Sequence, residues 1–393
     1  MSGEEGTMTT SRKTTVLLTV LALAALIAGG EALAQADRKT IKVGMLQMLT
    51  GDLARYGIPL RDAGLFAVEE VNAAGGINGR KVEVLLEDVG SAPQGSVQAA
   101  LKLIQRDRAD VLMQGGTSGH TLATIPVADE HKIVMANMST AESITQQGSK
   151  WTFRVARVPN SILDRKFAQY VAREMKLQRV AVVYGNDEMG RDAATIFVKA
   201  LESQGVKPVA VEQVQVGDPD VSAQVTRAKA ANPQAIFVQG HSNEATKIIR
   251  TVRQLIPGNI TILGFDQMTT SKFIEESGGA RNLEGMIYRT GILGEQSADP
   301  DPKAFVAKWK AKYPNSDTLL PMIQYAGMQV LFEALRQAGD NLSREGIRDA
   351  FYKVQSFKTI LGPVSVQPDG ETMNVVHIMK LVGGKGEIVK ENY

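Results

Sequence analysis

Polar residues that could hold a small ligand follow the apolar runs of this sequence at four places. The segments are residues 114–121, 138–141, 240–243 and 264–267. Each carries glycines, hydroxyls or amides directly after a run typical of a buried strand. Glycine lets the backbone turn sharply, and the first N–H groups of a following helix can bind a carboxylate. The spacing therefore predicts a binding site for a small polar ligand.

Hydroxyl-bearing residues of the first two segments are candidate partners for a carboxylate. Ser118 and Gly119 lead into a helical stretch, while Ser139 and Thr140 follow Met138 after the next strand. If these strands are neighbours in a parallel sheet, Ser118 and Thr140 meet at one edge and can hold one ligand. The alternative is that the hydroxyls cap helices, a common role for serine and threonine. Spacing alone leaves both interpretations open.

The last two segments add one acidic residue. Asp266 follows the apolar run 260–263, and its carboxylate could pair with a ligand ammonium. Alternatively, Asp266 could be the N-cap of a helix that begins at Thr269.

The elements that must position these residues alternate between short apolar runs and amphipathic stretches. The runs 41–46, 82–86, 111–113 and 133–136 are too short for helices and are bounded by Gly, Asp or Asn, which predicts buried strands. The same alternation restarts after residue 155. Alternating strands and helices predict an α/β protein with largely parallel sheets, and two such series predict two lobes.

The lobe boundaries follow from this alternation. We expect residues 37–157 with 290–360 to form the first lobe, and residues 158–289 with 361–393 to form the second. Because no long Gly/Ser-rich or Pro-rich linker separates the series, we expect short, ordered crossovers. The candidate crossovers are residues 156–159, 288–293 and 359–364.

The first 36 residues have the pattern of an export signal. Arg12 and Lys13 precede an apolar run, 16–28, that is shorter than the roughly 20 residues needed to span a bilayer. Small residues follow, and they predict cleavage after Ala34 or Ala36. With no cysteine available for a lipid anchor, we expect a soluble protein of the periplasm. An uncleaved N-terminal anchor is the alternative.

Composition argues against several classes of function. The 393 residues include no cysteine, which removes disulfides, thiolate metal sites and cysteine nucleophiles. Lys and Arg number 44 against 42 Asp and Glu, so no basic excess exists to neutralise nucleic acid. The four histidines are widely spaced, and nucleotide and hydrolase motifs are absent. We therefore expect no metal, no cofactor and no nucleic-acid partner, with an enzyme as the minor alternative.

Several motifs are shared with a known family. The most specific is Gly-Gly-Ile-Asn-Gly at residues 75–79, between the first expected helix and the second strand. The others, spread over nearly all of the chain beyond the signal, are residues 41–44, 50–51, 56–57, 139–141, 153–155, 325–326 and 361–363, with the Ser118 loop. In these motifs the chain resembles the periplasmic leucine/isoleucine/valine-binding proteins, the type I solute-binding proteins of ABC transporters.

This resemblance implies two Rossmann-like lobes, with central, largely parallel sheets, joined by three crossovers and closing over an amino acid. By position, Ser118 and Thr140 would bind the ligand carboxylate, and Asp266 would pair with its ammonium. Tyr56 would line the first-lobe wall. The resemblance also implies delivery of the ligand to the membrane permease of an ABC transporter, without enzyme activity.

Two positions depart from the family pattern. His241 stands where the family often has an aromatic residue, and Met189 stands where tyrosine is frequent. Both would belong to the side-chain pocket, so a branched-chain or related amino acid, an aromatic acid and another small carboxylic acid all stay open as ligands. A ligand sensor that docks on a receptor instead of a permease is a further alternative.

Overall fold

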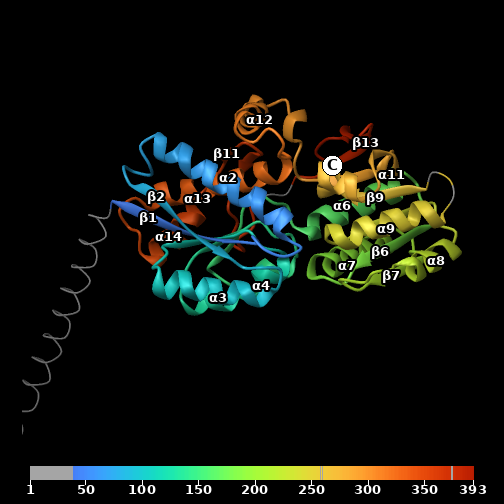
Figure 1. Ribbon diagram of the computed structural model, residues 1–393, viewed down its shortest axis with the longest axis horizontal. Helices are drawn as coiled ribbons and strands as arrows, with labels where there is room; N and C mark the ends of the chain where they lie inside the picture. The colour runs from blue at the N-terminus through green and yellow to red at the C-terminus, as the bar shows by residue number, and fades with distance from the viewer. Residues whose placement is uncertain (1–38, 257, 259, 373–374) are drawn as a thin grey trace, which may run out of the picture.

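A computed structural model describes residues 39–256, 258, 260–372 and 375–393. Two α/β lobes lie side by side, each built on its own sheet (Figure 1). The expected export signal, residues 1–36, lies outside the described residues. Within the described ranges, no helix is long and apolar enough to cross a membrane.

The first lobe is built on a five-stranded parallel sheet in the order β2-β1-β3-β4-β5. Strands β3 and β4 are neighbours, with Gln114 opposite Asn137. The segments that follow these two strands therefore begin at the same edge of the sheet, as the interpretation of Ser118 and Thr140 requires. The strands are β1 (Thr40–Gln47), β2 (Lys81–Asp88), β3 (Val111–Gln114), β4 (Met135–Asn137) and β5 (Thr152–Arg154).

Helices cover both faces of this sheet (Figure 1). Because side chains alternate along a strand, Ile41, Val43 and Met45 of β1 pack into one hydrophobic cluster and Leu46 packs into the other. The cluster around Leu46 includes α3 (Pro93–Leu101), a π-helix (Lys102–Arg106) and α4 (Ser118–Glu130). The opposite cluster includes α2 (Ala54–Ala73), α13 (Leu319–Ala338) and α14 (Arg344–Lys353). Helix α12 (Pro300–Lys312) packs Phe305 and Trp309 against Phe66 of α2.

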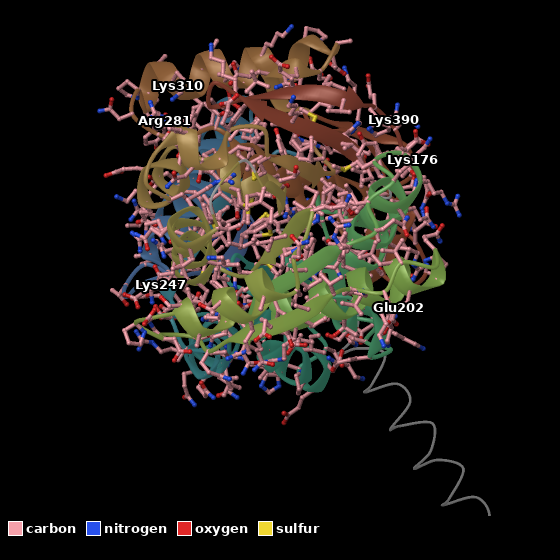
Figure 2. The ribbon with its side chains drawn as sticks, turned by 90° about the vertical axis from the view of Figure 1, so that its right-hand side faces the viewer. Lys176, Glu202, Lys247, Arg281, Lys310 and Lys390 are labelled. Carbon is pink, nitrogen blue, oxygen red and sulfur yellow. The ribbon has the colours of Figure 1, made fainter. Side chains whose placement is uncertain are left out.

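The second lobe is built on a seven-stranded sheet in the order β14-β13-β10-β9-β8-β6-β7. Strand β13 runs antiparallel to both of its neighbours, and the other pairs are parallel. Charged side chains, among them Lys176 and Glu202, point outward from this lobe (Figure 2). The strands are β6 (Val180–Gly185), β7 (Ala210–Val214), β8 (Ala235–Gln239), β9 (Thr261–Phe265), β10 (Ile287–Thr290), β13 (His377–Val382) and β14 (Lys385–Lys390).

Two pairs of helices cover this second sheet. Phe167 of α6 and Phe197 of α7 pack on one face, where Phe197 stacks on Phe237 of β8 with ring centroids 4.0 Å apart. Side chains of α8 and α9, among them Val225 and Ile248, pack on the other face. The covering helices are α6 (Asn160–Arg173), α7 (Glu188–Ser203), α8 (Ser222–Ala230) and α9 (Ser242–Leu255). Two short helices, α10 (Ser271–Glu276) and α11 (Ala280–Leu283), also belong to this lobe.

Three connections join the lobes, and the third differs from our expectation. The first two run from β5 to α6 and from β10 to α12, close to the expected positions. The third was expected at residues 359–364, but β11 (Phe357–Thr359) and β12 (Gly362–Val364) form an antiparallel hairpin there. The Gly370 carbonyl then accepts a hydrogen bond from the Arg154 amide of β5, and Glu371 forms an ion pair with the Arg154 guanidinium at 2.8 Å.

This ion pair explains the later crossing. The Arg154 side chain is fully buried, and a buried guanidinium needs a carboxylate partner. Glu371 supplies it, which keeps residues 361–371 with the first lobe. The described chain therefore stays with the first lobe up to Glu371, and β13 of the second lobe begins at His377.

Candidate functional site: a cavity between the lobes

A cavity of about 580 Å³, counting the part that opens to solvent, lies between the lobes. Both lobes and the first connection contribute to its walls. The lining residues are Met48, Tyr56, Leu60, Gly115, Gly116, Thr117, Ser118, Met138, Ser139, Thr140, Arg157, Met189, His241, Gln267, Leu320 and Ile323.

The turn after β3 brings the start of α4 to this cavity. The backbone at Gly115 packs closely against Gln47, because a Cβ there would lie 2.1 Å from the Gln47 Oε1 atom and would force that side chain to move. The Gln114 side chain then accepts a hydrogen bond from the Gly116 amide at 2.9 Å, which holds the backbone in its bend. Thr117 and Ser118 are thereby placed at the positive end of the helix dipole of α4.

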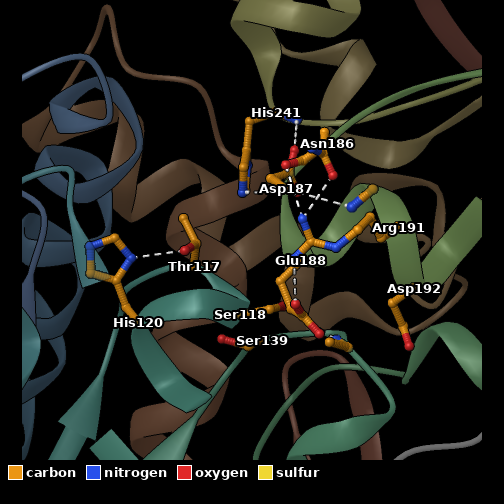
Figure 3. Close-up of polar contacts among 12 residues, drawn as sticks. Thr117, Ser118, His120, Ser139, Asn186, Asp187, Glu188, Arg191, Asp192 and His241 are labelled. Atoms are coloured by element: carbon orange, nitrogen blue, oxygen red, sulfur yellow. Dashed lines mark hydrogen bonds and ion pairs between the residues drawn. The ribbon is translucent and has the colours of Figure 1, made fainter. Parts of the chain in front are cut away.

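The capping alternative is contradicted at both hydroxyl segments. Thr117 is the N-cap of α4 but makes no side-chain cap; its hydroxyl bonds to Nδ1 of His120 at 2.8 Å (Figure 3). The next helix, α5 (Ser143–Gln146), has Glu142 as its N-cap, so neither Ser139 nor Thr140 caps it. The first N–H groups of α4 therefore carry no side-chain cap and are available to an anion.

Hydrogen bonds tie the loops after β3 and β4 to each other. The Ser118 hydroxyl accepts from the Ala141 amide at 3.3 Å, and the hydroxyls of Ser139 and Thr121 are 2.7 Å apart. These bonds fix Ser118 and Ser139 as parts of one wall. Thr140 lies in the same wall, and its carbonyl accepts from the Asn160 amide of α6 at 2.8 Å.

The second-lobe wall is organised by Asp187. Its carboxylate accepts from the Gly190 amide at 2.9 Å as the N-cap of α7, and it also lies 3.8 Å from Nε2 of His241. His241 in turn faces Tyr56 of α2 across the cleft, with ring centroids 6.1 Å apart. Figure 3 shows α4 and α7 on opposite sides of the cleft, with Thr117 and Ser118 facing Asp187 and His241.

Most of the predicted site residues meet at this cavity, but two do not line it. Gly119 lines an adjoining outer groove instead. Asp266 is 4% exposed and lies behind Arg157, whose Nη1 atom donates to its Oδ2 atom at 2.8 Å. The predicted residues that line the cavity are Tyr56, Ser118, Met138, Ser139, Thr140, Met189 and His241.

Asp266 is also not the N-cap that the alternative required. The helix after it, α10, begins at Ser271, and its N-cap is Thr270, whose hydroxyl accepts from the Phe273 amide at 3.4 Å. Asp266 opens a short 3₁₀ turn and makes no side-chain cap there. Its carboxylate instead accepts hydrogen bonds from Arg157 and from the Thr290 hydroxyl, the latter at 3.2 Å.

Sequence reasoning missed Arg157 as a site residue. This arginine lies in the expected first crossover, which we considered only as a connection. An arginine in a segment that joins two lobes lies next to the cleft between them, and that position was the available signal. Gln267 belongs to the predicted segment 264–267 but was not singled out there, and no pattern marked Leu320 or Ile323 as cavity residues.

His120 is the strongly perturbed titratable group beside the cavity. It is buried in the first turn of α4, and burial together with the nearby His241 lowers its pKa from 6.5 to about 4. Its Nδ1 atom is bonded to the Thr117 hydroxyl. A neutral His120 therefore holds Thr117 in place at the cavity wall over the ordinary pH range.

Comparison with known proteins agrees with this architecture. A family model described as "Periplasmic binding protein" matches residues 40–386, which is most of the chain. The chain belongs to the periplasmic binding protein family. Members of this family bind solutes, and the two-lobed fold with parallel sheets and three connections is the one that the sequence predicted.

Relatives of this periplasmic binding protein cover nearly its whole length. It is 30% identical over 395 residues to the "Leu/Ile/Val-binding protein homolog 1" of Brucella abortus, covering 97% of this chain and 99% of that one. It is 27% identical over 335 residues to the "Leucine-, isoleucine-, valine-, threonine-, and alanine-binding protein" of Pseudomonas aeruginosa, covering 85% and 88%.

Solved structures share the fold. The substrate-binding protein LivJ of Streptococcus pneumoniae, in complex with isoleucine, superposes with a TM-score of 0.81 at 25% identity, covering 90% of this chain and 100% of that one. A solute-binding protein of Rhodopseudomonas palustris, in complex with 3,4-dihydroxybenzoic acid, gives 0.79 at 22% identity, covering 91% and 97%. The same fold thus accommodates an amino acid in one protein and an aromatic acid in another.

Proposed function

We propose that this protein is an extracytoplasmic solute-binding protein that captures a small carboxylate-bearing solute between its lobes and delivers it to the permease of an ABC importer. One observation carries the proposal: a single cavity is lined by hydroxyls and a helix N-terminus of the first lobe and by Met189, His241 and Gln267 of the second. The names of its relatives, which include amino-acid-binding proteins, support the solute class.

The capture mechanism follows from the position of these groups. A ligand that touches both walls makes its full set of contacts only when the lobes are closed, so binding shifts the equilibrium toward the closed form. Hydrogen bonds to a charged ligand contribute roughly 1.5–3 kcal/mol each. A carboxylate held by several such bonds therefore accounts for much of a micromolar affinity, about −8 kcal/mol.

Location and delivery rest on the export signal and the family. The pattern of residues 1–36 predicts removal of the segment and release into the periplasm, where a capture protein meets its solute. The closed form would then present both lobes to the permease. As part of the same proposal, the protein binds and delivers its solute without converting it chemically.

The first experiment is a thermal-shift screen of protein that has been unfolded and refolded to remove carried ligand. Amino acids and small carboxylic acids are compared with their methyl esters and amides. A ligand at 100 times its Kd stabilises the protein by about 2.7 kcal/mol, so melting temperatures should rise for acids and not for esters. If esters and amides stabilise the protein as well as the free acids do, the carboxylate assignment is wrong.

The matched variant is Thr140→Val, which removes a cavity hydroxyl while keeping the shape of the side chain. We expect it to weaken carboxylate binding about tenfold, because one hydrogen bond to a charged group is lost. Thr195→Val, at an exposed position of α7, is the control. Equal affinities in the two variants, measured by calorimetry, would remove Thr140 from the site.

A further inference from the structure

We propose that the cavity selects a carboxylic acid that lacks an α-ammonium group, and that Arg157 is the residue that determines this specificity. The inference rests on the proposed function, since it names the class of carboxylate that the same cavity takes. It departs from the amino-acid interpretation because of how Arg157 and Asp266 lie relative to the cavity wall.

The carboxylate that would bind an ammonium already has a cationic partner. Arg157 Nη1 and Asp266 Oδ2 are 2.8 Å apart, and the two side chains are 8% and 6% exposed. Arg157 lines the cavity and Asp266 does not. A ligand therefore meets the guanidinium first, with the acid behind it.

Asp266 is held in this position by more than one bond. Thr290 donates to the same carboxylate at 3.2 Å, and Thr269 donates to the Asp266 backbone carbonyl at 2.7 Å. Turning the carboxylate toward a ligand would break its bonds to Thr290 and Arg157 and leave Arg157 buried without an anion. Removing one partner of a buried ion pair is strongly unfavourable, so the pair should persist when a ligand enters.

The rest of the wall offers an ammonium group no anionic partner. Among the described residues that line the cavity, none is Asp or Glu, and Arg157 carries a permanent positive charge. An ammonium placed there would lose its hydration and face a like charge. Both effects disfavour an amino acid relative to the same acid without its amine.

The cavity wall favours a carboxylate for the same reasons that it disfavours an ammonium group. The guanidinium carries five N–H donors in a planar fork, more than the Asp266 oxygen can accept, so donors remain for a ligand. The Ser118 and Thr140 hydroxyls and the uncapped N-terminus of α4 lie in the same cavity wall. The cavity thus holds a permanent cation, hydroxyl donors and a helix dipole of the right sign for an anion.

The remaining walls indicate the body of the ligand. They are mostly thioether, aliphatic and aromatic, which suits an uncharged carbon skeleton. The ligand class is therefore a small monocarboxylate with an aliphatic or aromatic body. The apolar lining residues are Met48, Tyr56, Leu60, Met138, Met189, Leu320 and Ile323.

The test compares ligands that differ only in the amine. Refolded protein is titrated calorimetrically with leucine and 4-methylpentanoate, and with phenylalanine and 3-phenylpropanoate. We expect at least one acid of these pairs to bind more than tenfold tighter than its amino acid. If the amino acids bind tighter, this inference is overturned while the proposed function stands. If no free acid or amino acid binds in this set or in the wider screen, both are overturned.

Variants at the ion pair give a second, independent measurement. Arg157→Met should weaken binding of the acid at least tenfold. It should also reduce or reverse the ratio of the affinity for the acid to that for the amino acid, because Asp266 then has no guanidinium between it and the ligand. Asp266→Asn keeps the shape of the side chain and should tighten acid binding several-fold, since the guanidinium no longer shares its charge. Arg61→Met, at a partly exposed position of α2, is the control.

The two variants keep the inference testable if one of them fails to fold, which circular dichroism would show. Loss of amino-acid binding in Asp266→Asn, with acid binding unchanged, would mean that Asp266 pairs with a ligand ammonium and would overturn the inference. Tighter acid binding in Asp266→Asn would support it even without the Arg157 variant.

Discussion

At the scale of single residues, the sequence predicted which side chains lie together only where the order of neighbouring strands brings them to the same edge of a sheet. Ser118 and Thr140 follow neighbouring parallel strands, so their meeting could be inferred from the order of the strands. Asp266 was assigned correctly to the end of a strand, but its role depends on Arg157, which is 109 residues away in the sequence. No local pattern specifies such a contact.

His120 gives a prediction for the dependence of stability on pH. Its pKa is lowered to about 4 in the folded protein, mainly by burial. Between pH 6.5 and 4 the unfolded chain therefore binds a proton that the folded protein does not, and the stability contributed by neutral His120 is lost as the pH falls. The loss amounts to about 3 kcal/mol at most.

Replacing the group isolates this contribution. The free energy of unfolding of His120→Asn, measured with urea from pH 7 to pH 4, should fall less steeply than that of the wild-type protein. His131→Asn, at the surface end of α4, controls for the loss of a histidine. Parallel curves for His120→Asn and the wild type would show that His120 is not held neutral by the fold.

At the scale of elements, the apolar runs predicted the central strands because these strands are buried on both faces and read as continuous apolar sequence. Strand β14 was missed because residues 385–390 are mostly exposed and polar, so no apolar run marks them. The third connection was placed too early because Glu371 reaches back to Arg154, 217 residues away. Edges and connections depend on such distant contacts, whereas buried strands do not.

Helix α2 forms a contact across the cleft that should stabilise the closed form. Arg55, in its first turn, forms an ion pair with Glu276 of α10 at 2.7 Å and a hydrogen bond to the Asn243 side chain of α9. The ion pair joins two partly buried side chains from opposite lobes. Because an exposed pair contributes about 0.2–1 kcal/mol, Arg55→Met should weaken ligand binding roughly two- to fivefold.

This effect should fall mainly on the dissociation rate, since a contact between the lobes should form only once they have closed. Stopped-flow measurement with the tightest ligand of the screen would separate the two rates. Lys308→Met removes an ion pair of similar length, with Glu70, that lies within the first lobe. A loss of affinity as large in Lys308→Met would mean that the Arg55 pair has no special part in closure.

At the scale of the whole molecule, contacts between the lobes occur at separate points around the cavity. Asp192 of α7 accepts from the Glu142 amide at 3.1 Å, and Asp317 accepts from the hydroxyl of Ser271 at 2.7 Å. With the Arg55 pair, these contacts hold the two lobes against each other in the described structure. The two-lobed fold was predictable because the alternation of strands and helices restarts after residue 155. The contacts between the two lobes could not be predicted in this way.

Closure can be measured by small-angle X-ray scattering. Saturating ligand should lower the radius of gyration of refolded protein, because the lobes approach when the cavity fills. Without ligand, a combined Arg55→Met and Asp317→Ala variant should have a larger radius of gyration than the wild type, since it lacks two of the contacts between the lobes. An identical radius with and without ligand, in a protein shown to bind, would rule out closure as the response.

The order of strands in the second sheet also affects how the chain is made. Strand β10 is paired on one side with β9 and on the other with β13, which begins only at His377. Until β13 has joined the sheet, one edge of β10 has no strand partner and can pair with another chain. Strands β13 and β14 therefore complete the second sheet, and truncation before His377 should favour aggregation over a smaller stable protein.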